Sequence, residues 1–126
     1  MKLRVLLVED NRLNSELARA VLELGGHQVE VAPSAEAFRA MLKTDLVPDI
    51  VLMDYLLPEA NGIVLLKELR ANARFARVPV VALTAHVLPS DIKRFLAEGF
   101  GGVLTKPIEV RRFAEEVERF ANRKDL

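Results

Sequence analysis

The sequence contains no cysteine and no tryptophan, and aromatic residues make up only 6% of it. Without thiols, the chain can form neither a disulfide framework nor a thiolate metal site or nucleophile. It also lacks an excess of charge of either sign, because 18 Lys and Arg residues balance 18 Asp and Glu residues. No overall positive field would hold such a chain on nucleic acid, and we expect no direct nucleic-acid binding.

A long apolar run is missing as well. The apolar residues 5–8 end at Glu9-Asp10, which leaves too few for a signal peptide or a membrane span. We therefore expect a cytoplasmic protein without membrane insertion. With 126 residues, 51% of them hydrophobic, the chain can form one core but not two. We predict a single domain over residues 1–126, with a polar end at residues 122–126 that frays.

Five short apolar runs alternate with amphipathic stretches along the chain. The runs cover residues 3–8, 28–32, 50–53, 78–83 and 102–104. This alternation predicts an α/β fold, in which helices cover both faces of a doubly wound, five-stranded parallel sheet. The first, third and fourth runs are almost continuously apolar, as central strands are, whereas residues 28–32 alternate and indicate an edge strand.

Helical periodicity fills the segments between these runs. Ser34 is placed to cap the second helix, the third follows Gly62, and the fourth covers residues 90–98. Gly25-Gly26 and Gly99 end the first and fourth helices. The side chains that we expect to face the core are Leu13, Leu17, Ala20, Val21 and Leu24 in the first helix, Ala35, Phe38, Met41 and Leu42 in the second, and Val110, Phe113, Ala114, Val117 and Phe120 in the last.

Polar residues follow four of the predicted strands at the point where each strand ends. They are Glu9, Asp10, Asp54, Thr84 and Lys106. Ligands of an open parallel sheet bind at the carboxyl ends of its strands, so these side chains are the candidates for a site. Three carboxylates at one rim repel each other unless a cation neutralises them. Oxygen ligands without thiolates favour magnesium, and Mg²⁺ is the cofactor that we expect.

The two histidines are poor candidates for metal ligands. His27 follows the Gly25-Gly26 pair in a turn, where we expect an exposed or capping residue. His86 lies two residues beyond Thr84 and would overhang the rim.

A carboxylate beside Mg²⁺ can act as a nucleophile toward phosphorus and form an aspartyl phosphate, and Asp54 is our candidate. Lys106 would then hold one phosphoryl oxygen, and the Thr84 hydroxyl would donate to another. Each residue alone also fits an ordinary role, such as a helix cap or a solvated charge. Their joint position at four strand ends favours the phosphoacceptor hypothesis.

Four segments of the chain resemble the receiver domain of two-component response regulators. They are LLVEDN at 6–11, LMDYLLP at 52–58 with Gly62, VALTA at 81–85 and LTKPI at 104–108. The resemblance covers residues 3–120 and implies a flavodoxin-like fold with strand order 2-1-3-4-5, like the single-domain regulators of chemotaxis.

The resemblance also implies a function in a phosphorelay. Asp54 would be phosphorylated by a histidine kinase or a histidine phosphotransfer protein, and Glu9 and Asp10 would bind Mg²⁺ with it. The backbone carbonyl of Tyr55 would complete the metal site. Thr84 and Lys106 would sense the phosphoryl group, and the Lys106-Pro107 bond is expected to be cis. A downstream protein would bind the surface formed by the fourth helix, the last strand and the last helix.

One position departs from the family pattern. Val103 stands where the family usually carries Tyr or Phe, three residues before Lys106. That aromatic normally moves with the threonine, so the coupling from the site to the surface is expected to be altered. Phe100 is a candidate to replace it in part.

Two enzyme or carrier functions with similar folds fit the sequence less well. A phosphatase of the haloacid-dehalogenase type, which forms an aspartyl phosphate intermediate, would carry a second Asp two residues after the nucleophile, where this chain has Leu56. A flavodoxin-like carrier would have phosphate-binding donors in the loop at residues 9–12, which is instead acidic. We therefore expect no enzymatic activity beyond self-phosphorylation from small donors and self-dephosphorylation. An interaction module that is never phosphorylated, and a receiver fragment of a hybrid kinase or multidomain regulator, remain alternatives.

Overall fold

The computed structural model describes residues 2–85 and 88–122. Strands and helices alternate along this part of the chain, as the apolar runs predicted. The elements are β1 (Arg4–Val8), α1 (Arg12–Leu24), β2 (Gln28–Ala32), α2 (Ala35–Leu42), β3 (Ile50–Asp54), α3 (Gly62–Arg70), a 3₁₀ turn (Ala73–Phe75), β4 (Val80–Thr84), α4 (Pro89–Glu98), β5 (Gly102–Thr105) and α5 (Val110–Ala121).

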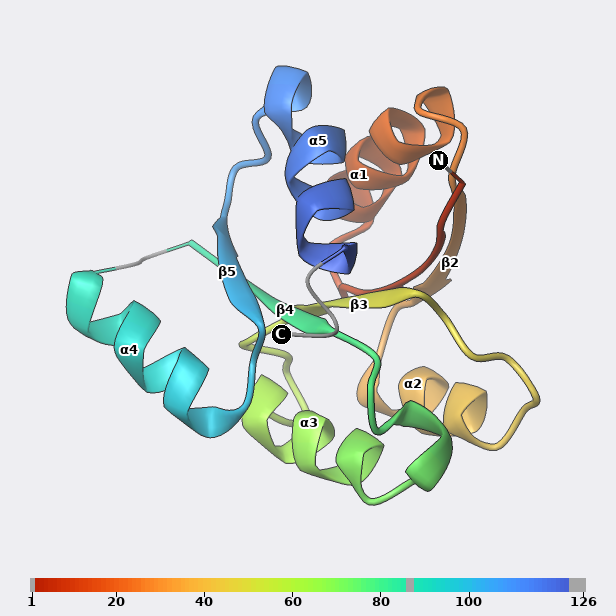
Figure 1. Cartoon of the computed structure of the whole chain (residues 1–126), viewed down its shortest axis with the longest axis vertical. Helices are drawn as coiled ribbons and strands as arrows, with labels where there is room; N and C mark the ends of the chain where they lie inside the picture. Colours follow the sequence, from red (N-terminus) through yellow and green to blue (C-terminus); the bar gives the residue numbers. More distant parts are fainter. Residues whose placement is uncertain (1, 86–87, 123–126) are drawn as a thin grey trace.

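The five strands form one parallel sheet in the order β2-β1-β3-β4-β5 (Figure 1), which confirms the order that the family resemblance implied. β2 lies at one edge, as its alternating pattern predicted, and every residue of β3 and β4 is buried. The strands are in register at their carboxyl ends, where Asp54 pairs with Leu83 and Thr84 pairs with Thr105. The residues that follow the strands therefore share one edge of the sheet.

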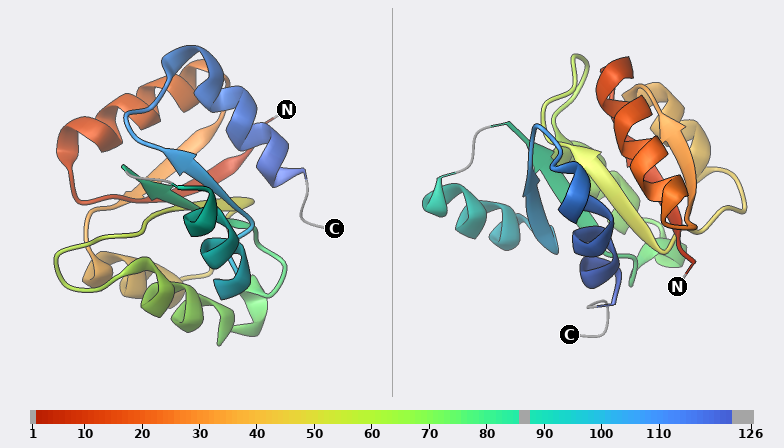
Figure 2. Two further views of the ribbon diagram at one scale, coloured as in Figure 1. Left: turned by 90° about the vertical axis from the view of Figure 1, so that its left-hand side faces the viewer. Right: turned by 90° about the horizontal axis from the view of Figure 1, so that it is seen from above.

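Helices cover both faces of the sheet. α1 and α5 pack side by side on one face, and α2, α3 and α4 lie on the other (Figures 1 and 2). Neighbouring residues of the central strands point to opposite faces, so Leu52 packs toward α1 and α5 while Met53 packs toward α2, α3 and α4. Two apolar layers thus hold the sheet between them.

Side-chain caps and glycines set the helix boundaries. Asn11, Ser34 and Asn61 accept hydrogen bonds from the first turns of α1, α2 and α3, and Ser34 had been predicted to do so. Gly26 and Gly99 have φ values of 91° and 113°, which favour glycine after α1 and α4. The inward residues predicted for α2 are buried or half-buried.

The predicted inward face of α1 is wrong. Leu13, Leu17, Ala20 and Leu24 are exposed, Leu13 by 78% and Leu24 by 89%. Of the predicted residues only Val21 is buried, together with Ser15, Ala18 and Leu22. The small side chains of Ser15 and Ala18 let the helix backbone approach its neighbours closely, which larger leucines would prevent. Val110 is also exposed, because it is the first residue of α5 and the buried stripe of that helix starts at Phe113.

His27 is buried, which corrects the prediction of an exposed turn residue. Its Nδ1 accepts the backbone N–H of Leu3 at 3.0 Å, and its Nε2 lies 2.7 Å from a carboxylate oxygen of Glu118. Because Nδ1 is the acceptor, Nε2 carries the proton and donates to Glu118. The imidazole therefore joins the start of β1, the turn before β2, and α5.

Candidate metal centre

Four strands deliver the predicted site residues to one edge of the sheet. Glu9 and Asp10 follow β1, Asp54 and Thr84 end β3 and β4, and Lys106 follows β5. These strands are neighbours in the sheet, so the topology alone brings their carboxyl ends together.

Three carboxylates form an acidic cluster at this edge. Glu9, Asp10 and Asp54 each offer an oxygen, and these oxygens all lie within 4.8 Å of one another. Glu9 and Asp54 are buried, whereas Asp10 is exposed and borders solvent. This set of oxygen donors fits a hard divalent cation such as Mg²⁺, which is usually bound through one or two carboxylates and keeps several waters.

The ammonium group of Lys106 lies against two of these carboxylates. Its Nζ is 2.7 Å from Oε1 of Glu9 and 3.0 Å from Oδ2 of Asp54. The backbone N–H of Lys106 donates to the carbonyl of Thr84 at 2.9 Å, which fixes the end of β5 to the end of β4. The Lys106-Pro107 bond is cis, as the resemblance implied.

Burial and charge shift the ionisation of this group of side chains. Burial raises the pKa of the Glu9 carboxyl above its usual value; the hydrogen bond from Lys106 opposes the shift, and Asp54 adds to it. Burial lowers the pKa of Lys106, but its hydrogen bonds to Glu9 and Asp54 outweigh this, so its pKa lies above the usual value. Lys106 is therefore charged at neutral pH and serves as a counter-ion for both carboxylates.

The backbone around Asp54 is held by further hydrogen bonds. The N–H of Leu56 donates to Oδ1 of Asp54 at 3.2 Å, and the N–H of Tyr55 donates to the carbonyl of Leu83 at 3.0 Å. The carbonyl of Tyr55 accepts the N–H of Gly62 at 2.6 Å. A Cβ atom at Gly62 would lie 3.1 Å from Cα of Tyr55, so a side chain there would push this turn outward.

Comparison with known proteins decides the family. A sequence model described as the response regulator receiver domain matches residues 5–118. The polar-differentiation response regulator DivK of Brucella ovis is 34% identical over 117 residues, which cover 92% of this chain and 94% of that protein.

The chain belongs to the response regulator receiver family.

Solved structures of receivers share the fold. The signal receiver domain of a signal transduction histidine kinase from Syntrophus aciditrophicus is 29% identical, with a TM-score of 0.80 over 94% of this chain and 89% of that chain. The chemotaxis response regulator CheY4 of Vibrio cholerae superimposes with a TM-score of 0.85, covers 95% of this chain and 99% of its own, and is 23% identical. This second likeness shows the fold alone. Receiver domains are in general phosphoacceptor switches rather than enzymes with turnover.

An aromatic cluster lies next to the acidic edge of this receiver. Tyr55 packs edge-on against Phe95 with ring centroids 4.5 Å apart, and Phe100 lies 6.0 Å from each of them. Phe100 is buried and Val103 packs half-buried on the same side of the sheet. The sequence had singled out Phe100, and Tyr55 only for its backbone carbonyl. The contact between the rings of Tyr55 and Phe95 was not predicted, because their positions in the chain do not show that they meet.

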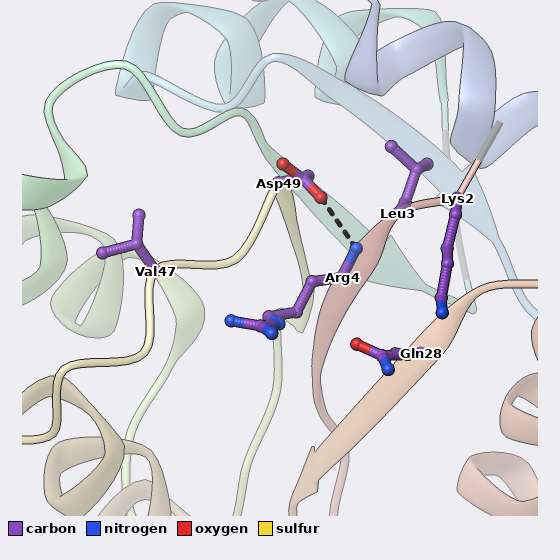
Figure 3. A pocket seen from close by; sticks show the side chains of 6 residues that line it. All are labelled: Lys2, Leu3, Arg4, Gln28, Val47 and Asp49. Carbon is purple, nitrogen blue, oxygen red and sulfur yellow. Dashed lines mark hydrogen bonds between the residues drawn. The ribbon is translucent and has the colours of Figure 1, made fainter.

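The opposite end of the sheet carries a different hollow. Figure 3 shows this pocket of about 280 Å³, in which the backbone N–H of Arg4 donates to Asp49 at 2.8 Å. Lys2 and Gln28 also line it, and a single carboxylate faces it, so it does not compete with the acidic cluster as a metal site.

His86 and residues 123–126 lie outside the described residues. Within residues 2–85 and 88–122, no helix is long and apolar enough to cross a bilayer.

Proposed function

We propose that this receiver accepts a phosphoryl group on Asp54 from a phosphohistidine of a partner protein. Mg²⁺ would be held by Glu9, Asp10, Asp54 and the backbone carbonyl of Tyr55. The observation that carries the proposal is the meeting of three carboxylates and one ammonium at a single edge of the sheet. A cluster of this kind is suited to a divalent cation and to the oxygens of a phosphoryl group.

The transfer moves one phosphoryl group between two nucleophiles. An oxygen of Asp54 attacks the phosphorus, and an acyl phosphate forms as the bond between phosphorus and the imidazole nitrogen of the donor breaks. The nitrogen keeps the electron pair of that bond, and the imidazole of the donor leaves as a neutral group because its other ring nitrogen carries a proton. Hydrolysis later adds water to the phosphorus, releases inorganic phosphate and restores the Asp54 carboxylate.

Lys106 and Thr84 would bind the phosphoryl oxygens. Lys106 already contacts Asp54, so its ammonium is within reach of a group attached to that carboxylate. Thr84 ends the strand next to β3, and its hydroxyl is our candidate for a second donor. When bound, Mg²⁺ supplies positive charge against the charge of the transferred group.

The partner proteins are a histidine kinase or a histidine phosphotransfer protein as the donor, and a downstream protein as the target. The donor must reach the rim where α1 begins, and α1 presents Leu13 and Leu17 to solvent from its first two turns. We assign part of the donor's contact to these leucines. The target would bind the surface of α4, β5 and α5, where Ile92 and Leu96 are exposed.

The test is phosphorylation by acetyl phosphate with Mg²⁺, followed by intact mass measurement. One phosphoryl group adds about 80 Da. We expect this gain in the native protein and in Asp45→Asn, which alters an exposed aspartate away from the site. We expect none in Asp54→Asn, nor after EDTA removes the metal. A folded native protein that binds Mg²⁺ but gains no mass would overturn the proposal and favour an interaction module that is never phosphorylated.

A further inference from the structure

α4 buries one side chain against the rest of the molecule. Phe95 is its one buried residue, whereas α1, α2, α3 and α5 each bury between two and four. The outward side of α4 is apolar in part, because Leu88, Ile92 and Leu96 are exposed at a spacing of four residues. The position of this helix therefore depends on what Phe95 contacts.

Phe95 contacts the residue that follows the proposed phosphoacceptor. The ring of Tyr55 meets Phe95 edge-on at 4.5 Å, and Phe100 completes the cluster. The hydroxyl of Tyr55 lies 3.4 Å from both carboxylate oxygens of Glu98, at the last turn of α4. Tyr55 thus touches α4 at two points, through its ring and through its hydroxyl.

The backbone of Tyr55 belongs to the acidic edge. Its peptide group is joined to Asp54, its N–H donates to Leu83 in β4, and its carbonyl accepts from Gly62. A change in the backbone at Asp54 must move the attached ring. β5, which also packs beside α4, carries no aromatic residue, and its contribution on this side is the half-buried Val103.

We propose that Tyr55 is a positioning residue, which links the state of Asp54 to the placement of α4 through the contact between its ring and Phe95. This inference rests on the proposed phosphorylation of Asp54. Under this inference, phosphorylation of Asp54 changes the exposed side of α4, and Tyr55 is the side chain that couples the two.

The experiment compares backbone amide NMR spectra of the full chain with and without Mg²⁺ and beryllofluoride, a phosphoryl analogue. The amides of Thr84 and Lys106 report occupancy of the site, and those of Ile92 and Leu96 report α4. In the native protein we expect both sets to shift. In Phe95→Leu, which leaves the acidic edge intact, we expect the shifts of Thr84 and Lys106 to remain and those of Ile92 and Leu96 to be lost.

Two variants of Tyr55 separate its ring from its hydroxyl. Tyr55→Phe keeps the ring and is expected to keep the α4 shifts, whereas Tyr55→Leu is expected to lose them at equal occupancy. Tyr55 is also the one tyrosine of a chain without tryptophan, so its fluorescence can be followed in the unaltered protein. We expect its emission to change when beryllofluoride binds, and this readout stands even if the leucine variants do not fold.

The outcomes are distinct. If Thr84 and Lys106 do not shift in the native protein, the proposed function fails and this inference fails with it. If they shift but the α4 amides keep their native response in Tyr55→Leu or Phe95→Leu, the inference alone is overturned. An unchanged tyrosine emission at a fully occupied site would overturn it as well.

Discussion

Lys106 has two partners at the residue scale, and they explain how buried carboxylates coexist in this receiver. Glu9 and Asp54 are both buried, and their charges would repel each other without a cation between them. The ammonium of Lys106 contacts both, at 2.7 and 3.0 Å. Before any metal binds, this side chain compensates part of the negative charge at the acidic edge.

Replacing Lys106 with Met should therefore destabilise the metal-free protein. Loss of one partner leaves buried charge uncompensated; because Lys106 is 17% exposed and partly screened, we expect a loss of about 1–3 kcal/mol in the free energy of unfolding. Urea unfolding at neutral pH measures it, with Lys93→Met on an exposed part of α4 as control. Saturating Mg²⁺ should reduce the difference in the free energy of unfolding between Lys106→Met and the native protein. Equal stability of both variants without metal would contradict the counter-ion role.

Glu9 should make the affinity for Mg²⁺ depend on pH. Burial raises the pKa of Glu9 above its reference value of 4.5, so its protonated form persists to higher pH than in an ordinary carboxyl. A protonated Glu9 is a poor ligand, so the affinity should be constant at high pH and should begin to fall above pH 4.5 as the pH is lowered. Calorimetric titrations with Mg²⁺ across this range test it. In Glu9→Gln the affinity should be lower and this part of the pH dependence should be absent.

At the scale of elements, the side chain of His27 joins β1, the turn before β2, and α5. No sequence pattern predicted this role. His27 has a fully buried side chain and bonds to Leu3 and Glu118. Its place after two glycines is typical of an exposed turn, but its Nε2 donates to Glu118 of α5, which is 91 residues away in the chain. Local sequence cannot report a contact over that separation.

His27→Ala should lower the free energy of unfolding by about 2–4 kcal/mol, because it removes buried volume and leaves the N–H of Leu3 without its acceptor. Urea unfolding measures this, and Gln28→Ala, at an exposed position beside it, should change stability little. Phosphorylation by acetyl phosphate should survive wherever the variant is folded. A loss no larger than that of Gln28→Ala would show that the two hydrogen bonds contribute little.

The misassigned face of α1 shows where periodicity loses information. Leu13, Leu17, Ala20 and Leu24 form an apolar stripe at helical spacing, yet that stripe is exposed. The buried side uses Ser15 and Ala18, whose small size lets the helix approach closely. Periodicity reports that a helix has an apolar side, but it does not say whether that side meets the core or another protein.

We expect Leu17→Arg to impair transfer from a phosphohistidine donor. Leu17 lies on the exposed side of α1, in the second turn of the helix, so a charge there should reduce docking without unfolding the helix. Phosphorylation by acetyl phosphate should be unchanged, because a small donor needs no docking surface. Leu24→Arg, at the far end of the same stripe, is the matched control and should have a smaller effect. If phosphorylation by acetyl phosphate fell as much as phosphorylation by the phosphohistidine donor, the defect would lie in the site and not in docking.

At the scale of the whole molecule, the sheet separates two apolar layers, and elements of both layers adjoin its carboxyl edge. α1 starts from this edge on one face (Figure 2), and Tyr55, which follows β3, contacts Phe95 of α4 on the other. The edge position of β2 was predicted from its alternating pattern, and the strand order from the family resemblance. The meeting of Glu9, Asp10, Asp54 and Lys106 then follows from that order. The burial of His27 and the Tyr55–Phe95 contact could not be predicted, because they depend on how helices distant in the chain pack.

Mg²⁺ should stabilise the whole fold, because the acidic cluster exists only when β1 and β3 are paired. An unfolded chain does not hold these carboxylates together, so binding to the folded state adds to the free energy of unfolding by mass action. Once the site is saturated, each tenfold increase in Mg²⁺ should add about 1.4 kcal/mol. Urea unfolding at a series of Mg²⁺ concentrations measures this, with NaCl at matched ionic strength as control. Asp10→Asn, which removes an exposed carboxylate of the cluster, should begin to gain stability only at higher Mg²⁺. An identical Mg²⁺ response in this variant, or an equal gain from NaCl, would show that the ion acts by general screening and not at the acidic edge.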